Sequence, residues 1–146
     1  MIGVEIDLIV SDSVRALELY QAIFETELIE VTNYPLGLNE AVFSIYGTRF
    51  HLLDENAEYK MIAPLPGDKR TMWVNLMVPD IAATWGKAMA AGCTEIQGIV
   101  DMPEIGVKNA MFIDPFNCLW MLHEITREVS FEERCKILEQ QMGIEK

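Results

Sequence analysis

Apolar positions recur with two different periods along the chain, and each period predicts one kind of element. Near the start, apolar residues at helical spacing follow Ser11-Asp12-Ser13, whose side-chain oxygens are suited to cap a helix. Short apolar runs around this stretch predict strands, the last two joined as a hairpin through Tyr46-Gly47-Thr48. The predicted strands are residues 4–10, 28–31, 41–45 and 50–53, and the helix face is Val14, Leu17, Tyr20 and Phe24.

The second half of the chain nearly repeats this pattern. Ala41-Val42-Phe43 precedes the apolar run 50–53, and sixty-nine residues later Ala110-Met111-Phe112 precedes a similar run. Pro79-Asp80 opens a second helix, which Gly92 ends. Two copies of a strand–helix–strand–strand–strand unit are therefore predicted, and each copy alone would leave a large apolar sheet face uncovered. The strands of the second copy are residues 72–78, 96–100, 107–113 and 119–124, and its helix face is Ile81, Trp85 and Ala88.

The predicted organisation has four parts. Residues 1–56 form the first module, residues 57–70 a linker rich in proline and charge, and residues 71–125 the second module. Residues 126–146 lie outside the repeat and carry a capping box, Ser130-Phe131-Glu132-Glu133, at the start of a helix. We expect the apolar stripe of this helix to pack on the protein's own sheet, with binding of a partner as the alternative. The stripe is Phe131, Cys135, Leu138 and Met142.

Composition and charge limit the classes of partner and the cellular compartment that we expect for this protein. The 146 residues are 51% hydrophobic and carry a net charge of −12, which disfavours nucleic acid as a partner. Apolar runs stay well short of the ~20 residues of a membrane span, and the N-terminus lacks the features of a secretory signal, so we expect a cytoplasmic protein without a membrane partner. Cys93, Cys118 and Cys135 show no paired spacing and are expected to be free thiols. Glycine-rich phosphate and dinucleotide motifs are absent, so no cofactor is expected.

The repeat and the turn Asp114-Pro115-Phe116-Asn117 together resemble the vicinal oxygen chelate superfamily, which includes glyoxalase I, bleomycin-resistance proteins and extradiol dioxygenases. The branch described as demethylubiquinone-methyltransferase-like, or phosphonate-operon-associated, commonly reads D-P-F-G-H-x-W here, where this chain has Asn117-Cys118 in place of Gly-His. The resemblance implies an α+β fold: two tandem βαβββ modules form a curled, eight-stranded mixed sheet with helices outside, plus a C-terminal helix. It also implies a half-open trough that holds the ligand, and a homodimer.

The resemblance allows a metal site to be tested position by position. Metal-dependent members place a ligand early in the first strand and late in the last strand of each module. These positions fall here on Glu5, Trp73 and Met121, and on Leu52 or, with a register slip of one residue, on His51. An indole cannot ligate a metal, and a thioether is too soft for the ions that such sites hold. We therefore expect no metal.

Strand alternation predicts what the trough would hold instead. Glu5 and Asp7 share one strand face, and two neighbouring carboxylates can yield a general base, so Glu5 is the candidate catalytic residue. Exposure at a sheet edge is the alternative for both carboxylates. The candidate ligand-binding residues are Asp7, Trp73, Asn75, Met77, Met121, His51 and His123. The large apolar members of this set could equally be core, and His123 could simply be solvated.

Three functions remain open on these observations. The first is a metal-free member of the superfamily that binds a small organic molecule. The second is a lyase, isomerase or dioxygenase-type enzyme of the same fold, with Glu5 as base or ligand. The third is a protein–protein module that docks a partner through the C-terminal helix, which requires the apolar stripe to be exposed.

Overall fold

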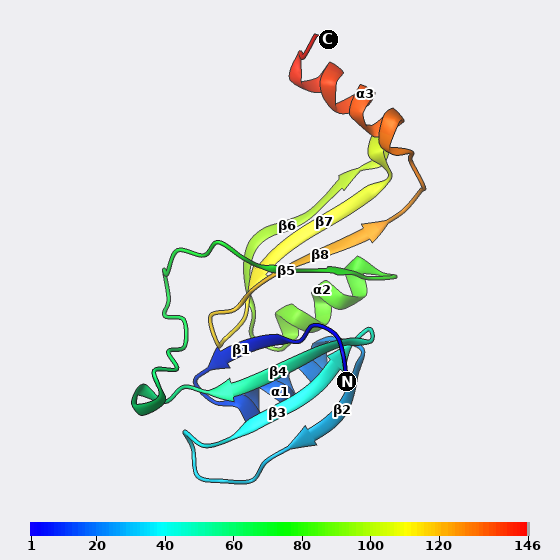
Figure 1. Cartoon of the computed structure of the whole chain (residues 1–146). Coiled ribbons are helices and arrows are strands. Elements are labelled where there is room, and N and C mark those ends of the chain that lie inside the picture. The colour runs from blue at the N-terminus through cyan, green and yellow to red at the C-terminus, as the bar shows by residue number, and fades with distance from the viewer. Residues whose placement is uncertain (146) are drawn as a thin grey trace.

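The computed structural model, which describes residues 1–145, contains the predicted repeat (Figure 1). The first module is β1 (Ile6–Val10), α1 (Ser13–Ile23), β2 (Thr26–Val31), β3 (Glu40–Ile45) and β4 (Thr48–Asp54). The second module is β5 (Val74–Met77), α2 (Ile81–Ala90), β6 (Thr94–Met102), β7 (Val107–Ile113) and β8 (Leu119–Ile125). Two short 3₁₀ turns, η1 (Ala57–Tyr59) and η2 (Pro103–Ile105), and the C-terminal helix α3 (Phe131–Met142) complete the described chain.

The strands form two mixed sheets of four with the same topology. The strand orders are β1-β4-β3-β2 and β5-β8-β7-β6, so β1 and β5 are both edge strands. In each sheet the edge strand pairs in parallel with the last strand of its module, and the other pairs are antiparallel. This arrangement confirms the predicted fold class: an α+β fold of two tandem βαβββ modules with eight strands and a C-terminal helix. The two sheets are not joined into a closed barrel.

In each module, carboxylates that accept backbone N–H groups hold the N-terminus of the helix in place. Asp12 and Asp80 are the N-caps of α1 and α2, and each side chain accepts a backbone N–H of the first turn. A carboxylate from the last strand adds a second acceptor: Asp54 accepts the N–H of Ser13 at 2.7 Å. In the second module the carboxylate of Glu124 accepts the N–H of Ile81 at 2.9 Å. Each helix start is thereby tied to the strand that lies beside β1 or β5.

The two modules meet back to back. Each helix covers the back of its own sheet, and one continuous hydrophobic core joins both backs. The ring of Tyr20 on α1 lies 5.1 Å from that of Trp120 on β8, and the ring of Phe24 lies 6.4 Å from that of Phe112 on β7. Phe50 on β4 also reaches Trp120, with 6.1 Å between ring centroids. The helix-covered side of the first sheet therefore packs against the helix-covered side of the second.

A buried carboxylate joins the modules at this junction. Asp114, which is 3% exposed, accepts the hydroxyl of Tyr20 at 2.6 Å and the indole N–H of Trp120 at 2.8 Å. Its other oxygen accepts the N–H groups of Phe116 and Cys118, which closes the turn before β8. Burial raises the pKa of Asp114 even though these donors favour its charged form. The sequence marked this turn as a family feature but did not indicate that it holds α1 of the other module.

The back-to-back packing determines where the remaining side chains point. Because Phe50 and Leu52 enter the core from β4, alternation sends His51 out of the opposite face of the first sheet. Trp120 and Leu122 enter the core from β8 in the same way. We call the two uncovered surfaces the open face of the first sheet and the open face of the second sheet. Sequence reasoning placed the side chains of both open faces on one concave side. Within one chain, however, the two open faces point away from each other.

The parts outside the modules extend away from the body. Residues 57–70 contain only η1 and an isolated bridge between Asn56 and Met61. Helix α3 projects from the end of the second sheet (Figure 1), and Phe131 and Met142 are 73% and 63% exposed. The expectation that its apolar stripe packs on the protein's own sheet is therefore wrong. No helix among residues 1–145 is long and apolar enough to cross a membrane.

The junction yields a prediction about stability. Tyr20→Phe keeps the ring but removes one of the donors to the buried Asp114. Leaving a buried acceptor short of a donor costs about 1–3 kcal/mol, so we expect a loss of that size in the free energy of unfolding by urea. Tyr59→Phe, at an exposed tyrosine, should change it by less than about 0.5 kcal/mol. Equal effects in the two variants would show that the hydrogen bond is not important for stability.

Candidate functional site

The register of β1 and β4 brings three candidate residues together. Asp7 lies directly opposite His51 in this parallel pair, and Glu5 lies two residues before Asp7, just ahead of β1. Leu52 is fully buried in the core, so the structure resolves the one-residue uncertainty of the sequence in favour of His51. The open face of the first sheet therefore presents two carboxylates and an imidazole.

These groups form a connected cluster. His51 Nδ1 lies 3.0 Å from Glu5 Oε1 and 3.7 Å from Asp7 Oδ1, and its Nε2 lies 3.3 Å from Glu40 Oε2. The Nε–H of Arg49 donates to Glu5 Oε2 at 2.5 Å. Both ring nitrogens of His51 thus face carboxylates, and the cluster combines three acidic side chains with one guanidinium.

The surroundings in the cluster shift the pKa values of Glu5 and Asp7 in opposite directions. The hydrogen bond from Arg49 is the main reason that the pKa of Glu5 is lowered. Partial burial, followed by the neighbouring Glu5, raises the pKa of Asp7. A carboxylate with a lowered pKa is a weak base, so of the two Asp7 is better suited to accept a proton near neutral pH than the expected Glu5.

The open face of the second sheet is mostly apolar. Met121 lies opposite Asn75, and His123 lies opposite Met77, so the predicted face alternation holds within this sheet. Trp73 and Met77 are 49% and 54% exposed, which is incompatible with ordinary core packing. Thioethers and an indole at the surface adapt readily to an apolar ligand. No strand pairing or ring contact among residues 1–145 brings this face onto the cluster of the first sheet.

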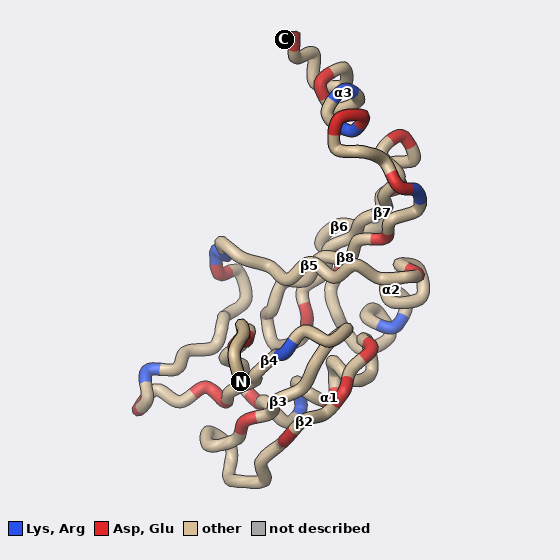
Figure 2. The backbone as a smooth tube through the Cα atoms, turned by 45° about the vertical axis from the view of Figure 1, so that its right-hand side comes forward, with Lys and Arg blue, Asp and Glu red and all other residues tan. Residues whose placement is uncertain are grey.

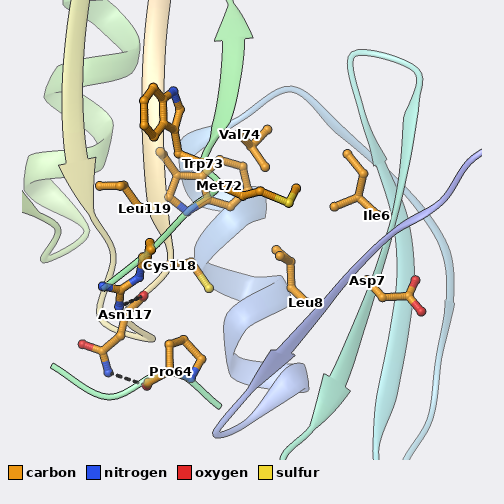
Figure 3. A pocket seen from close by; sticks show the side chains of 12 residues that line it. Ile6, Asp7, Leu8, Pro64, Met72, Trp73, Val74, Asn117, Cys118 and Leu119 are labelled. Carbon is orange, nitrogen blue, oxygen red and sulfur yellow. Dashed lines mark hydrogen bonds between the residues drawn. The ribbon is translucent and has the colours of Figure 1, made fainter. Parts of the chain in front are cut away.

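A narrow groove of about 280 Å³ separates the unpaired edges of β1 and β5 (Figure 3). Ile6 and Leu8 line one side and Met72 and Trp73 the other, so the groove is apolar. Figure 3 shows the carboxylate of Asp7 directed away from Trp73 and Met72. Asp7 also lines the groove, so the groove and the carboxylate cluster adjoin at this residue, although its carboxylate faces the cluster. The remaining lining residues are Pro64, Arg70, Val74, Asn117, Cys118, Leu119 and Trp120.

The cluster can also be tested against a divalent ion. Ligand atoms of Glu5, Asp7 and His51 lie within 4.8 Å of one another, and Asp7 is not among the positions at which the family resemblance places ligands. However, one oxygen of Glu5 is already paired with Arg49, whose charge opposes a second cation. Trp73 and Met121, on the other open face, offer neither oxygen nor nitrogen ligands of the kind these ions prefer. The residues of the two modules together do not fit the site of metal-dependent members.

The cysteines do not add a nucleophile. Cys93, Cys118 and Cys135 are free thiols, as predicted. Burial is the main cause that raises the pKa values of Cys93 and Cys118 to about 12. Both thiols are therefore protonated near neutral pH and are poor nucleophiles.

Sequence reasoning missed Arg49 and Glu40 as members of the cluster. Arg49 could have been found, because it lies two residues before His51 on the same strand and hence on the same face. Glu40 lies on the neighbouring strand, opposite Leu53, and its proximity to His51 depends on a register that the sequence alone does not determine.

Comparisons with known proteins agree with the architecture. A family model described as the Glyoxalase/Bleomycin resistance protein/Dioxygenase superfamily matches residues 4–122, and no curated protein matches the sequence. The fosfomycin resistance protein FosX from Listeria monocytogenes, solved with Mn(II) and sulfate, is 20% identical with a TM-score of 0.66, covering 94% of this chain and 99% of that one.

Two further solved structures are similar. TioX from Micromonospora sp. ML1 is 18% identical with a TM-score of 0.62, covering 88% of this chain and all of that one. A putative 3-demethylubiquinone-9 3-methyltransferase, PhnB protein, from Bacillus cereus is 15% identical with a TM-score of 0.63. The match covers 84% of this chain and 99% of that one. At these identities the likeness shows the fold and not the activity.

The cluster leads to a prediction about titration. In ¹³C NMR of the side-chain carboxyls, Glu5 should titrate below its ordinary pKa and Asp7 above it. Arg49→Gln removes the largest cause of the lowering and should raise the pKa of Glu5, while Lys136→Gln, remote on α3, should leave it unchanged. An unchanged titration of Glu5 in Arg49→Gln would contradict the ion pair.

Proposed function

The chain belongs to the glyoxalase/bleomycin resistance protein/dioxygenase superfamily, and we propose that it binds a small, partly apolar organic molecule between two copies of itself, without a resident metal. The open face of the first sheet in one copy supplies the polar wall of the site, and the open face of the second sheet in the other copy supplies the apolar wall. The observation that carries this proposal is the back-to-back packing, which directs the two faces of one chain away from each other.

The two faces are complementary in chemistry. The first carries Glu5, Asp7 and His51, and the second carries exposed Trp73 and Met77. Ligand sites commonly combine an apolar lining with a few converging polar groups, and neither face provides both parts alone. A second copy brings one face of each kind together.

The unpaired strand edges support the same assembly. β1 and β5 each pair on one side only, and exposed edges are usually paired or covered in native proteins. Contact between these edges in two copies would cover them and would place the open faces on either side of a shared trough. We therefore propose a homodimer. The free thiols suit a reducing compartment such as the cytoplasm.

Charge favours a neutral or positively charged ligand in this trough. The polar wall carries three carboxylates around His51, and its guanidinium, Arg49, is already paired with Glu5. An anionic ligand would meet uncompensated negative charge there.

An enzyme of the same fold is the second candidate. The observation that favours it is the raised pKa of Asp7, since a carboxylate with a raised pKa beside an imidazole is suited to abstract a proton. In this case Asp7 acts as base, and Glu5, paired with Arg49, orients His51. Loss of turnover but not of binding in Asp7→Asn would distinguish an enzyme from a binding protein.

A complementation experiment tests the shared trough. Light scattering should give twice the chain mass of 16.6 kDa. After a screen of small organic molecules has identified a ligand, Asp7→Lys and Met121→Lys should each abolish binding, because each disrupts one wall. A mixed dimer of the two variants contains one trough with both walls intact and should recover about half of the sites. A monomer in light scattering, or a mixed dimer that does not bind the ligand, would contradict the proposal.

A metal analysis tests the second part of the proposal. Because Arg49 is already paired with Glu5 and the other open face offers no hard ligand, we expect far less than one Mn, Fe, Ni or Zn per purified chain. The same result is expected for His51→Ala, which removes the one nitrogen donor near the carboxylates. One bound ion per chain, lost in His51→Ala, would show that the cluster is a metal site.

A further inference from the structure

A second hollow, of about 530 Å³, lies at the far end of the second sheet, where the chain turns into α3. Its floor comes from the ends of β7 and β8, and its rim comes from the segment that leads into the helix. His123, Arg127 and Arg134 all line it. The hollow is separate from the carboxylate cluster, which lies on the other sheet. The remaining lining residues are Ile105, Val107, Ile125, Glu128, Val129 and Ser130.

Two guanidinium groups meet here without a carboxylate partner. Arg127 donates from Nη2 to the carbonyl oxygens of Pro103 and Glu104, at 3.1 and 2.7 Å, and Arg134 lies 5.4 Å above the ring of Phe131. Neither arginine has a carboxylate oxygen within 4.0 Å among residues 1–145, although Glu128 also lines the hollow. Most lysines and arginines among residues 1–145 also lack such a partner, but these two line the same hollow, whose lining contains one acidic residue, Glu128. Figure 2 shows basic segments on both sides of the turn into α3.

One residue that lines the hollow carries an unsatisfied ring nitrogen. His123 Nδ1 is buried and has no hydrogen-bond partner among the described residues. A buried polar atom without a partner costs free energy unless a ligand or water satisfies it.

The way the chain leaves β8 holds these groups in place. Gly106 accepts the N–H groups of Thr126 and Arg127 with its carbonyl oxygen, at 2.8 and 3.3 Å. A Cβ at Gly106, whose φ is +67°, would lie 2.3 Å from the carbonyl oxygen of Arg127, so only glycine fits there. The guanidinium of Arg127 is therefore positioned before any ligand arrives.

We propose that this hollow binds a small oxyanion, either a free ion or the carboxylate or phosphate group of a larger molecule. The arginines supply planar, charged donors that match two oxygens of such a group, and His123 supplies a further donor from its ring. Its floor shares the open face of the second sheet with the apolar wall of the proposed trough, but one chain supplies all of its lining residues, so the site does not depend on the dimer.

Nuclear magnetic resonance of the full-length protein tests this site directly, because His51 and His123 are its only histidines. Inorganic phosphate and succinate are titrated separately at constant ionic strength, and the ring signals of both histidines are followed. We expect His123 to shift with saturation and His51, in the other cluster, to remain in place. Saturation by phosphate alone, succinate alone or both supports the site and identifies the group it prefers. Shifts of His51 and His123 in parallel, or no saturation with either ion, overturn the proposal.

Matched variants distinguish binding at this site from a general effect of the positive charge on α3. Arg134→Gln should weaken binding at least about tenfold, the loss expected for one charge-assisted hydrogen bond. Lys136→Gln removes the same charge from the same helix, at a residue paired with Glu132, and should leave the affinity within about twofold. Arg134→Lys keeps the charge and should give an intermediate loss, with circular dichroism to confirm that α3 is intact. Equal losses in Arg134→Gln and Lys136→Gln would mean that only the overall charge matters.

Discussion

The buried carboxylate of Asp114 is the constraint on which the arrangement of this molecule depends. A charge that is 97% removed from solvent needs strong donors, and it finds them in Tyr20 of the first module and Trp120 of the second. Those two contacts require α1 to lie against the back of the second sheet. Once the backs of both sheets are joined, alternation along β4 and β8 leaves each open face pointing outward. The position of one carboxylate thus determines that the candidate site is divided between two surfaces.

This division gives the duplication a functional consequence. Two identical modules would present two identical open faces, but here one carries carboxylates around His51 and the other carries indole and thioether side chains. Trp73 and Met121 occupy positions where the family pattern leads one to expect metal ligands, and both side chains are better suited to apolar contact than to the coordination of a hard ion. A ligand held between one face of each kind would gain apolar burial on one side and directional polar contacts on the other.

Much of this could be predicted from the sequence, because it depends on local periodicity. Every predicted strand and helix exists, and the capping box at Ser130 starts α3 as expected. The face shared by Glu5, Asp7 and His51 followed from alternation once the register was known. Asn117 illustrates the limit of the family pattern: it occupies a left-handed position, φ 65°, where the family commonly has glycine, and asparagine tolerates that conformation. The relative placement of the modules could not be predicted, because it depends on side chains far apart in sequence, such as Tyr20 and Asp114. The same holds for α3, whose amphipathic pattern predicts a helix but not which surface covers it.

The distribution of charge distinguishes the cluster around His51 from the hollow at the base of α3. Within a chain of net charge −12, three carboxylates surround His51 on the open face of the first sheet, and two arginines line the hollow at the base of α3. At physiological ionic strength the Debye length is about 8 Å, so each region acts mainly on the charged groups of a ligand that lie close to it. Among the lysines and arginines of residues 1–145, only Arg49 and Lys136 have a carboxylate partner, so what distinguishes Arg127 and Arg134 is that they line one hollow together. The hollow at the base of α3 and the cluster around His51 are therefore best understood as two sites of opposite charge preference on one scaffold.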